Sequence, residues 1–123
     1  MILIDSYGWL EYFLEGPLAD KYAKYVEEAN EDNCITPTVV VYEVFKRIRC
    51  LQGEQSALEA YSQLARTKII ELTSEIALEA AEISLAANLG MADSIVLASA
   101  KAFNAEILTS DKHLQGFKEC KFM

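Results

Sequence analysis

The chain has 123 residues, of which 52% are hydrophobic and 24% charged, so it resembles an ordinary globular domain rather than a disordered or membrane-embedded chain. Its formal net charge of -8, from 19 acidic and 11 basic side chains, argues against a protein that binds nucleic acid by charge alone. The longest apolar runs are too short to cross a bilayer and no export signal begins the chain, so we expect a cytoplasmic protein without a membrane segment.

The first half of the chain alternates short apolar runs with helical patterns. Ile2, Leu3 and Ile4 predict a buried strand, after which Ser6 can cap a helix that reaches Leu14. The further predicted elements are a helix starting at Pro17, a strand over 34–36 ending at Pro37, a helix over about 39–50 capped by Thr38, and a helix over about 56–67.

The second half continues this alternation. It predicts a strand over 68–72, a helix starting at Thr73 and Ser74, a helix over about 92–103, a strand over 106–109 and an edge strand over 118–122. In the first of these helices Glu75, Glu79 and Glu82 lie opposite the apolar stripe, which is typical of a solvated face. Strands that alternate with helices predict an α/β fold, a three-layer α/β/α sandwich with a parallel central sheet, formed by one domain over residues 1–123.

Two residue types limit the possible chemistry. The three cysteines are an odd number without C-x-x-C spacing, which favours free thiols over disulfides or a zinc site. The single histidine, His113, leaves histidine-based nucleophilic catalysis and zinc chemistry without most of their parts.

Four carboxylates fall near the predicted carboxyl ends of the strands, where open parallel sheets bind ligands. Asp5 ends the first strand, and Glu43 lies in the helix after the second. Asp93 opens the helix before the last main strand, and Asp111 follows that strand. Each of them interrupts an otherwise apolar or small-residue stretch.

Each carboxylate alone also has a structural explanation. The three aspartates lie where such residues cap helices, and Glu43 can pair with Lys46 or Arg47 on its own helix. Together, carboxylates that converge at one sheet edge repel one another unless a cation joins them. Oxygen ligands suit Mg²⁺ or Mn²⁺, which can ionise a water beside a phosphodiester.

Four segments of the sequence resemble those of a known family. They read MILIDS, PTVVVYEV, LGMADSIVLASA and AEILTSDKHL, and they span essentially the whole chain. In order and spacing they resemble the PIN-domain ribonucleases, and among these most closely the VapC toxins of prokaryotic toxin–antitoxin pairs.

The resemblance implies a site and a set of partners. Asp5, Glu43, Asp93 and Asp111 match the family's four acidic positions, and Thr109 matches its hydroxyl position. The implied activity is an endoribonuclease that uses Mg²⁺ or Mn²⁺ to hydrolyse RNA. The implied partners are a second copy in a homodimer and a cognate VapB-like antitoxin that inserts a tail at the active site.

Other functions stay open at this point. The strongest alternative is a catalytically inactive PIN-like module that binds RNA or protein. A phosphatase of the haloacid dehalogenase type needs a second aspartate where Tyr7 stands, and a receiver domain needs paired early acids that are absent here.

Three groups of side chains also have more than one explanation. Either contact with RNA phosphates or a solvated face explains Lys46, Arg47 and Arg49. Either contact with substrate or a surface turn explains Lys112 and His113. The aromatic residues of the first helix suit base stacking, a dimer surface or core packing: Tyr7, Trp9, Tyr12 and Phe13.

Overall fold

A computed structural model describes all residues from 1 to 123. Its centre is a five-stranded sheet in the order β3-β2-β1-β4-β5, in which every neighbouring pair is parallel. The strands are β1 (Ile2–Ile4), β2 (Cys34–Pro37), β3 (Lys68–Ile70), β4 (Glu106–Thr109) and β5 (Cys120–Phe122). The predicted α/β fold with a parallel sheet is confirmed.

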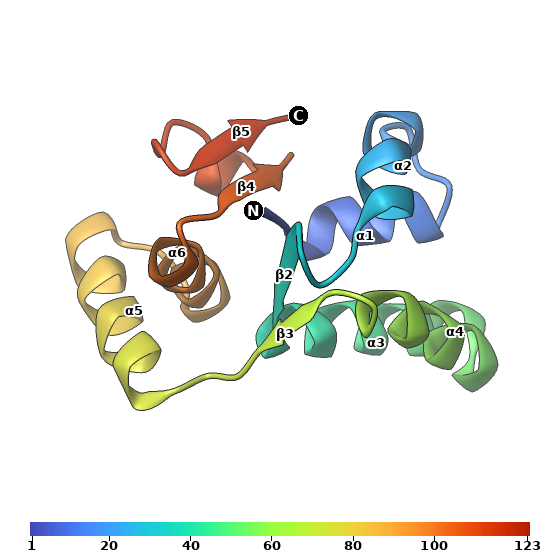
Figure 1. The fold of residues 1–123 in the computed structure, drawn as a ribbon, viewed down its shortest axis with the longest axis horizontal. Coiled ribbons are helices and arrows are strands. Elements are labelled where there is room, and N and C mark those ends of the chain that lie inside the picture. Colours follow the sequence, from blue (N-terminus) through green and yellow to red (C-terminus); the bar gives the residue numbers. More distant parts are fainter.

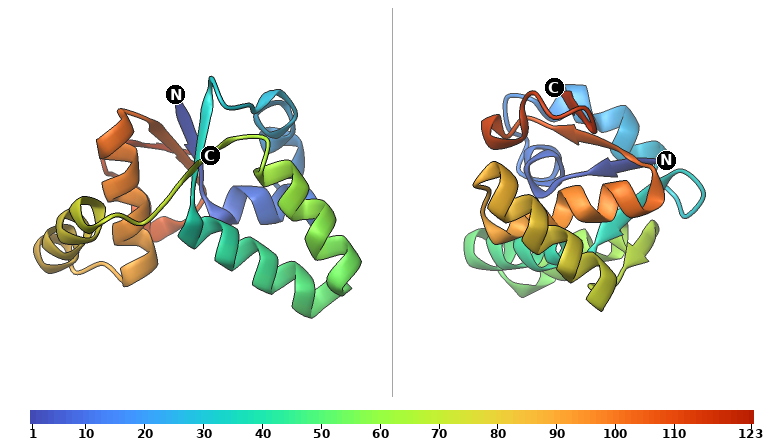
Figure 2. Two further views of the ribbon diagram at one scale, coloured as in Figure 1. Left: turned by 60° about the horizontal axis from the view of Figure 1, so that its bottom comes forward. Right: turned by 90° about the vertical axis from the view of Figure 1, so that its left-hand side faces the viewer.

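Helices cover the sheet on both sides. They are α1 (Ser6–Phe13), α2 (Ala19–Glu28), α3 (Thr38–Gln52), α4 (Glu54–Leu64), α5 (Ser74–Ala87) and α6 (Met91–Phe103), with a short 3-10 helix at Lys112–Leu114. In Figure 1, α5 and α6 lie on the left of the molecule, α1 and α2 lie on its upper right, and α3 and α4 run below the strands toward the lower right. The left view of Figure 2 shows the α3–α4 and α5–α6 pairs diverging on the two sides of the strands.

The core consists of the central strands and the faces that the helices turn toward them. β1, β2 and β4 have almost no exposed apolar side chains, and α6 is buried along most of its length. Trp9 of α1 and Tyr22 of α2 are the largest fully buried side chains. Gly8 allows these two helices to approach closely, because a Cβ at this position would collide with the Tyr22 ring.

Several predicted elements match the structure. β4 covers the residues expected of it, and β5 is an edge strand within the predicted range. Thr73 caps α5 by accepting a hydrogen bond from the Ile76 amide at 3.2 Å. All three cysteines are free, as predicted.

Three predicted starts or caps of helices are wrong. Asp5, not Ser6, is the N-cap of α1, because α1 follows β1 so closely that the one extended residue between them is Asp5. The N-cap of α3 is Pro37, which makes no side-chain capping bond, so Thr38 is the first helical residue. α2 begins at Ala19 rather than Pro17, since the Leu18 amide donates to the carboxylate of Glu11 in α1.

Two other boundaries also differ from the prediction. β3 ends at Ile70 because its neighbour β2 ends at Pro37, which leaves residues 71 and 72 without a strand to pair with. α4 begins at Glu54 because Gly53, at a φ of 94°, both ends α3 and precedes α4.

No single helix is long and apolar enough to span a membrane. Only α5 and α6 taken together reach that length and composition, and they are bent by 119° relative to each other.

Candidate active site

The candidate site lies at the carboxyl ends of the two central strands. β1 and β4 are neighbours, with Ile4 opposite Leu108, so the residues after both strands meet at this edge. Asp5 follows β1 directly, and the buried last residue of β4, Thr109, donates its hydroxyl hydrogen bond to Asp5 Oδ2. The strand pairing therefore brings together residues that are more than 100 positions apart in the sequence.

Asp5 is a buried carboxylate with two protein donors. Only 5% of the residue is exposed, and its Oδ1 accepts a hydrogen bond from the Gly8 amide at 3.1 Å. Burial raises its pKa to about 6, against the opposing effect of the bonds from Thr109 and Gly8, and the charges of Asp111 and Asp93 raise it further.

A turn after β4 holds Asp111 in the same region. The Asp111 amide donates to Thr109 Oγ1 at 3.0 Å, which continues the chain of bonds that begins at Asp5. Asp111 Oδ1 accepts from the backbone amide and from Nδ1 of His113, both at 2.9 Å. The turn is tied to α2 by a bond of 2.7 Å between the hydroxyls of Ser110 and Tyr22.

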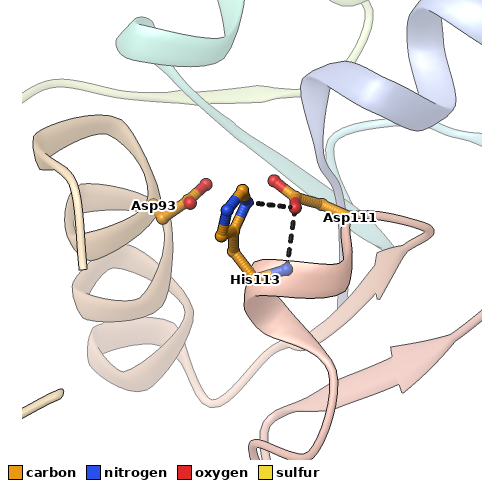
Figure 3. Close-up of side chains that lie close together, drawn as sticks. All are labelled: Asp93, Asp111 and His113. Atoms are coloured by element: carbon orange, nitrogen blue, oxygen red, sulfur yellow. Dashed lines mark hydrogen bonds and ion pairs between the residues drawn. The ribbon is translucent and has the colours of Figure 1, made fainter. Parts of the chain in front are cut away.

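Asp93 reaches the site from the first turn of α6. It does not cap this helix, since the N-cap is Gly90 and no side chain makes a capping bond there. Burial and the charge of Asp111 raise the pKa of Asp93, while His113 lowers it. Figure 3 shows Asp93, Asp111 and His113 pointing toward a common space, and one ligand atom from each lies within 4.8 Å of the others.

Glu43 contributes from α3 and is half-buried. Burial raises its pKa, a hydrogen bond from Ser6 lowers it, and the charges of Asp93 and Asp111 raise it. The alternative that Glu43 pairs with Lys46 or Arg47 is not supported, since neither forms an ion pair and Lys46 instead donates to the Tyr42 hydroxyl at 3.3 Å. Ser6 therefore acts on the pKa of Glu43, while Asp5 caps α1.

The donor set fits a hard divalent cation. Three of the four acidic side chains have raised pKa values, caused first by burial and then by mutual repulsion, and the protein places no lysine or arginine in an ion pair with any of them. A cation would relieve this repulsion, and carboxylate oxygens are the ligands that Mg²⁺ and Mn²⁺ favour. The structure thus places ligand atoms of Asp93, Asp111 and His113 within 4.8 Å of one another and links Asp5 to Asp111 through Thr109, while Glu43 approaches from α3.

His113 was not singled out as part of this group. The sequence left it open between substrate contact and a surface turn, and it lies in the 3-10 turn beside Asp111. Its position two residues after an aspartate that caps a helical turn was the only available signal, because such turns bring residues i and i+2 together.

The chain matches known proteins over almost its whole length. The family model of the PIN domain matches residues 2–119, whereas no curated protein matches the sequence. A toxin–antitoxin complex from Klebsiella pneumoniae has a similar chain with a TM-score of 0.78 and 20% identity, over 98% of this chain and 96% of the other.

Two further structures are similar. VapC20 from Mycobacterium tuberculosis, a toxin that cleaves the sarcin–ricin loop, has a TM-score of 0.79 at 14% identity over 97% of this chain and 98% of the other. VapBC2 from Rickettsia felis, bound to a DNA fragment from its promoter, gives 0.76 at 16% identity over 100% and 98%. These likenesses concern the fold, and together with the match to the family model they show that the chain belongs to the PIN-domain family.

Proposed function

We propose that this protein is an endoribonuclease of the VapC type, which hydrolyses RNA phosphodiester bonds with a divalent cation, Mg²⁺ or Mn²⁺. The observation that carries the proposal is the group of acidic side chains beyond the carboxyl ends of β1 and β4. Ligand atoms of Asp93, Asp111 and His113 lie within 4.8 Å of one another, and Thr109 joins Asp5 to Asp111 by two hydrogen bonds. Membership of the PIN-domain family supports the nuclease class.

Each residue of the site has a proposed role. Asp5 and Asp93 are the main metal ligands, and Glu43 and Asp111 complete the site directly or through water. Thr109 orients Asp5, because its hydroxyl donates to one carboxylate oxygen while the Gly8 amide occupies the other. Its Oγ1 also accepts the Asp111 amide, so one hydroxyl aligns two of the four acidic residues.

When bound, the cation would supply the positive charge that lowers the pKa of an attacking water and stabilises the departing oxygen. The protein itself holds the acidic residues in place before substrate arrives, by the bonds to Asp5 and Asp111. This arrangement reduces the reorganisation needed during reaction.

The substrate would approach along α3. Lys46, Arg47 and Arg49 are exposed on this helix and form no ion pair, although the chain holds 19 acidic side chains. Tyr42, next to Glu43, is 61% exposed and lies under the Lys46 ammonium at 5.4 Å. We propose that these cations contact RNA phosphates and that Tyr42 stacks on a base.

The proposed assembly follows the relatives. The Klebsiella pneumoniae structure is of a toxin–antitoxin complex, and we propose by similarity that this chain is one PIN-like domain over residues 1–123 that forms a homodimer and binds a cognate VapB-like antitoxin.

Cleavage of RNA by the purified protein tests the function. End-labelled total RNA is incubated with Mg²⁺ or Mn²⁺ and wild-type protein, beside an Asp93→Asn variant purified in the same way. We expect discrete products from the wild type that the variant and excess chelator abolish. If a folded, cation-binding wild type yields no products but retains RNA or a protein partner, the alternative of an inactive PIN-like binding module replaces the proposal.

A further inference from the structure

His113 presents a free ring nitrogen beside the acidic cluster. Its Nδ1 lies 2.9 Å from Asp111 Oδ1, and since a carboxylate oxygen only accepts, Nδ1 carries the hydrogen of this bond. The other ring nitrogen, Nε2, forms no hydrogen bond with the protein, and the side chain is 78% exposed. In the neutral ring, Nε2 therefore has a lone pair available to a ligand.

This arrangement is the one that metal-binding histidines adopt. Such a histidine usually donates its second ring N–H to a carboxylate, which fixes the tautomer and makes the free nitrogen a better ligand. The backbone amide of His113 also donates to Asp111 Oδ1, so the ring and the carboxylate are held by two bonds to the same oxygen. A ligand atom of His113 lies within 4.8 Å of those of both Asp93 and Asp111 (Figure 3).

We propose that Nε2 of His113 is a nitrogen ligand of the cation and that it makes the site prefer Mn²⁺ to Mg²⁺. The inference rests on the proposed function and deepens it, because four carboxylates alone suit either ion. Mg²⁺ favours oxygen ligands and holds its waters tightly, whereas first-row transition ions accept imidazole more readily. One nitrogen ligand among the carboxylates thus lets the site bind Mn²⁺ more tightly than Mg²⁺, although the two ions have equal charge.

The test uses the fact that His113 is the only histidine in the chain. Purified wild-type protein is loaded with Mn²⁺, and electron spin-echo modulation detects any imidazole nitrogen bound to the ion. The same experiment on protein carrying ¹⁵N-histidine assigns the signal, and His113→Gln is the variant without it. Calorimetric titrations of Mg²⁺ and Mn²⁺ with wild type and variant give the ratio of the two dissociation constants.

We expect an imidazole coupling in the wild type that changes with ¹⁵N-histidine and is absent from His113→Gln. The preference for Mn²⁺ over Mg²⁺ should fall by about tenfold in the variant, while its thermal melting temperature stays near that of the wild type because the side chain is exposed. Bound Mn²⁺ without imidazole coupling, or a preference that the substitution leaves unchanged, overturns the inference. If the wild type still cleaves RNA in that case, the proposed function stands; if it binds neither ion, both fail.

Discussion

Two groups of acidic side chains in this molecule lie in opposite surroundings. On α5, Glu75, Glu79 and Glu82 are exposed and point away from the core, and one of them pairs with Lys101 at 3.6 Å. At the sheet edge, Asp5 is almost fully buried, and Glu43 and Asp93 are partly buried among other acids. Burial and proximity to other acids, and not the number of acidic residues, therefore distinguish the candidate site from a solvated face.

Substitutions in these two groups of acidic residues should differ most in their effect on RNA cleavage. Asp5→Asn or Asp93→Asn should lower the cleavage rate by more than about a hundredfold, because each removes a charge from the cation ligands. Glu82→Gln changes the same kind of group on α5 and should leave the rate unchanged. The rates are measured on one labelled RNA at a fixed Mn²⁺ concentration, and equal losses in all three variants would contradict the distinction.

The two groups of acidic residues should contribute differently to the pH dependence of the protein's free energy of unfolding. Burial raises the pKa of Asp5 from 3.8 in the unfolded chain to about 6, so the folded state binds this proton more tightly. Between about pH 4 and 6 the folded protein holds more protons than the unfolded one, and its free energy of unfolding should fall by about 3 kcal/mol as pH rises through this range.

Urea denaturation in chelator at pH 4 and pH 7 checks this expectation. Asp5→Asn should lose most of the dependence, whereas Glu82→Gln should keep it. An Asp5→Asn profile that parallels the wild type would assign the dependence to other groups.

Loss of the Thr109 hydroxyl should have a smaller effect on stability. Thr109→Val leaves Asp5 Oδ2 and the Asp111 amide without their partner in a buried region, which should cost about 1 to 3 kcal/mol of unfolding free energy. Thr109→Ser retains the hydroxyl and is the matched control. Denaturation midpoints that are equal for the two variants would mean that the two bonds contribute little.

Cation binding should stabilise the protein modestly through the sheet-edge group alone. At a concentration of ten times the dissociation constant, Mn²⁺ should raise the free energy of unfolding by about 1.4 kcal/mol. Thermal melts should show this gain in the wild type and in Glu82→Gln but not in Asp93→Asn. A gain that persists in Asp93→Asn would locate the cation elsewhere.

Sequence reasoning predicted the parallel α/β fold and the acidic cluster because both depend on regular patterns. Apolar runs alternate with helical periodicity, and parallel strands bring their carboxyl ends to one edge, so Asp5 and Asp111 were expected to meet. The glutamates of α5 were likewise predicted as a solvated face from their position opposite the apolar stripe.

The predictions that were wrong or missing concern features that depend on contacts beyond the local sequence. The end of β3 is set by its pairing with β2, and the late start of α2 follows from a bond between Leu18 and Glu11. The role of Asp5 as the cap of α1 depends on how closely strand and helix follow each other, and His113 joins the site through the conformation of one turn. Local propensity does not determine such features.

Soaking a crystal of the protein in Mn²⁺ is the most direct test of the proposed cation site, because anomalous scattering locates the ion independently of activity. We expect an anomalous peak within ligand distance of Asp93 and of at least one other carboxylate among Asp5, Glu43 and Asp111. Peaks only along the glutamates of α5, or none at a Mn²⁺ concentration that supports RNA cleavage, would contradict this expectation.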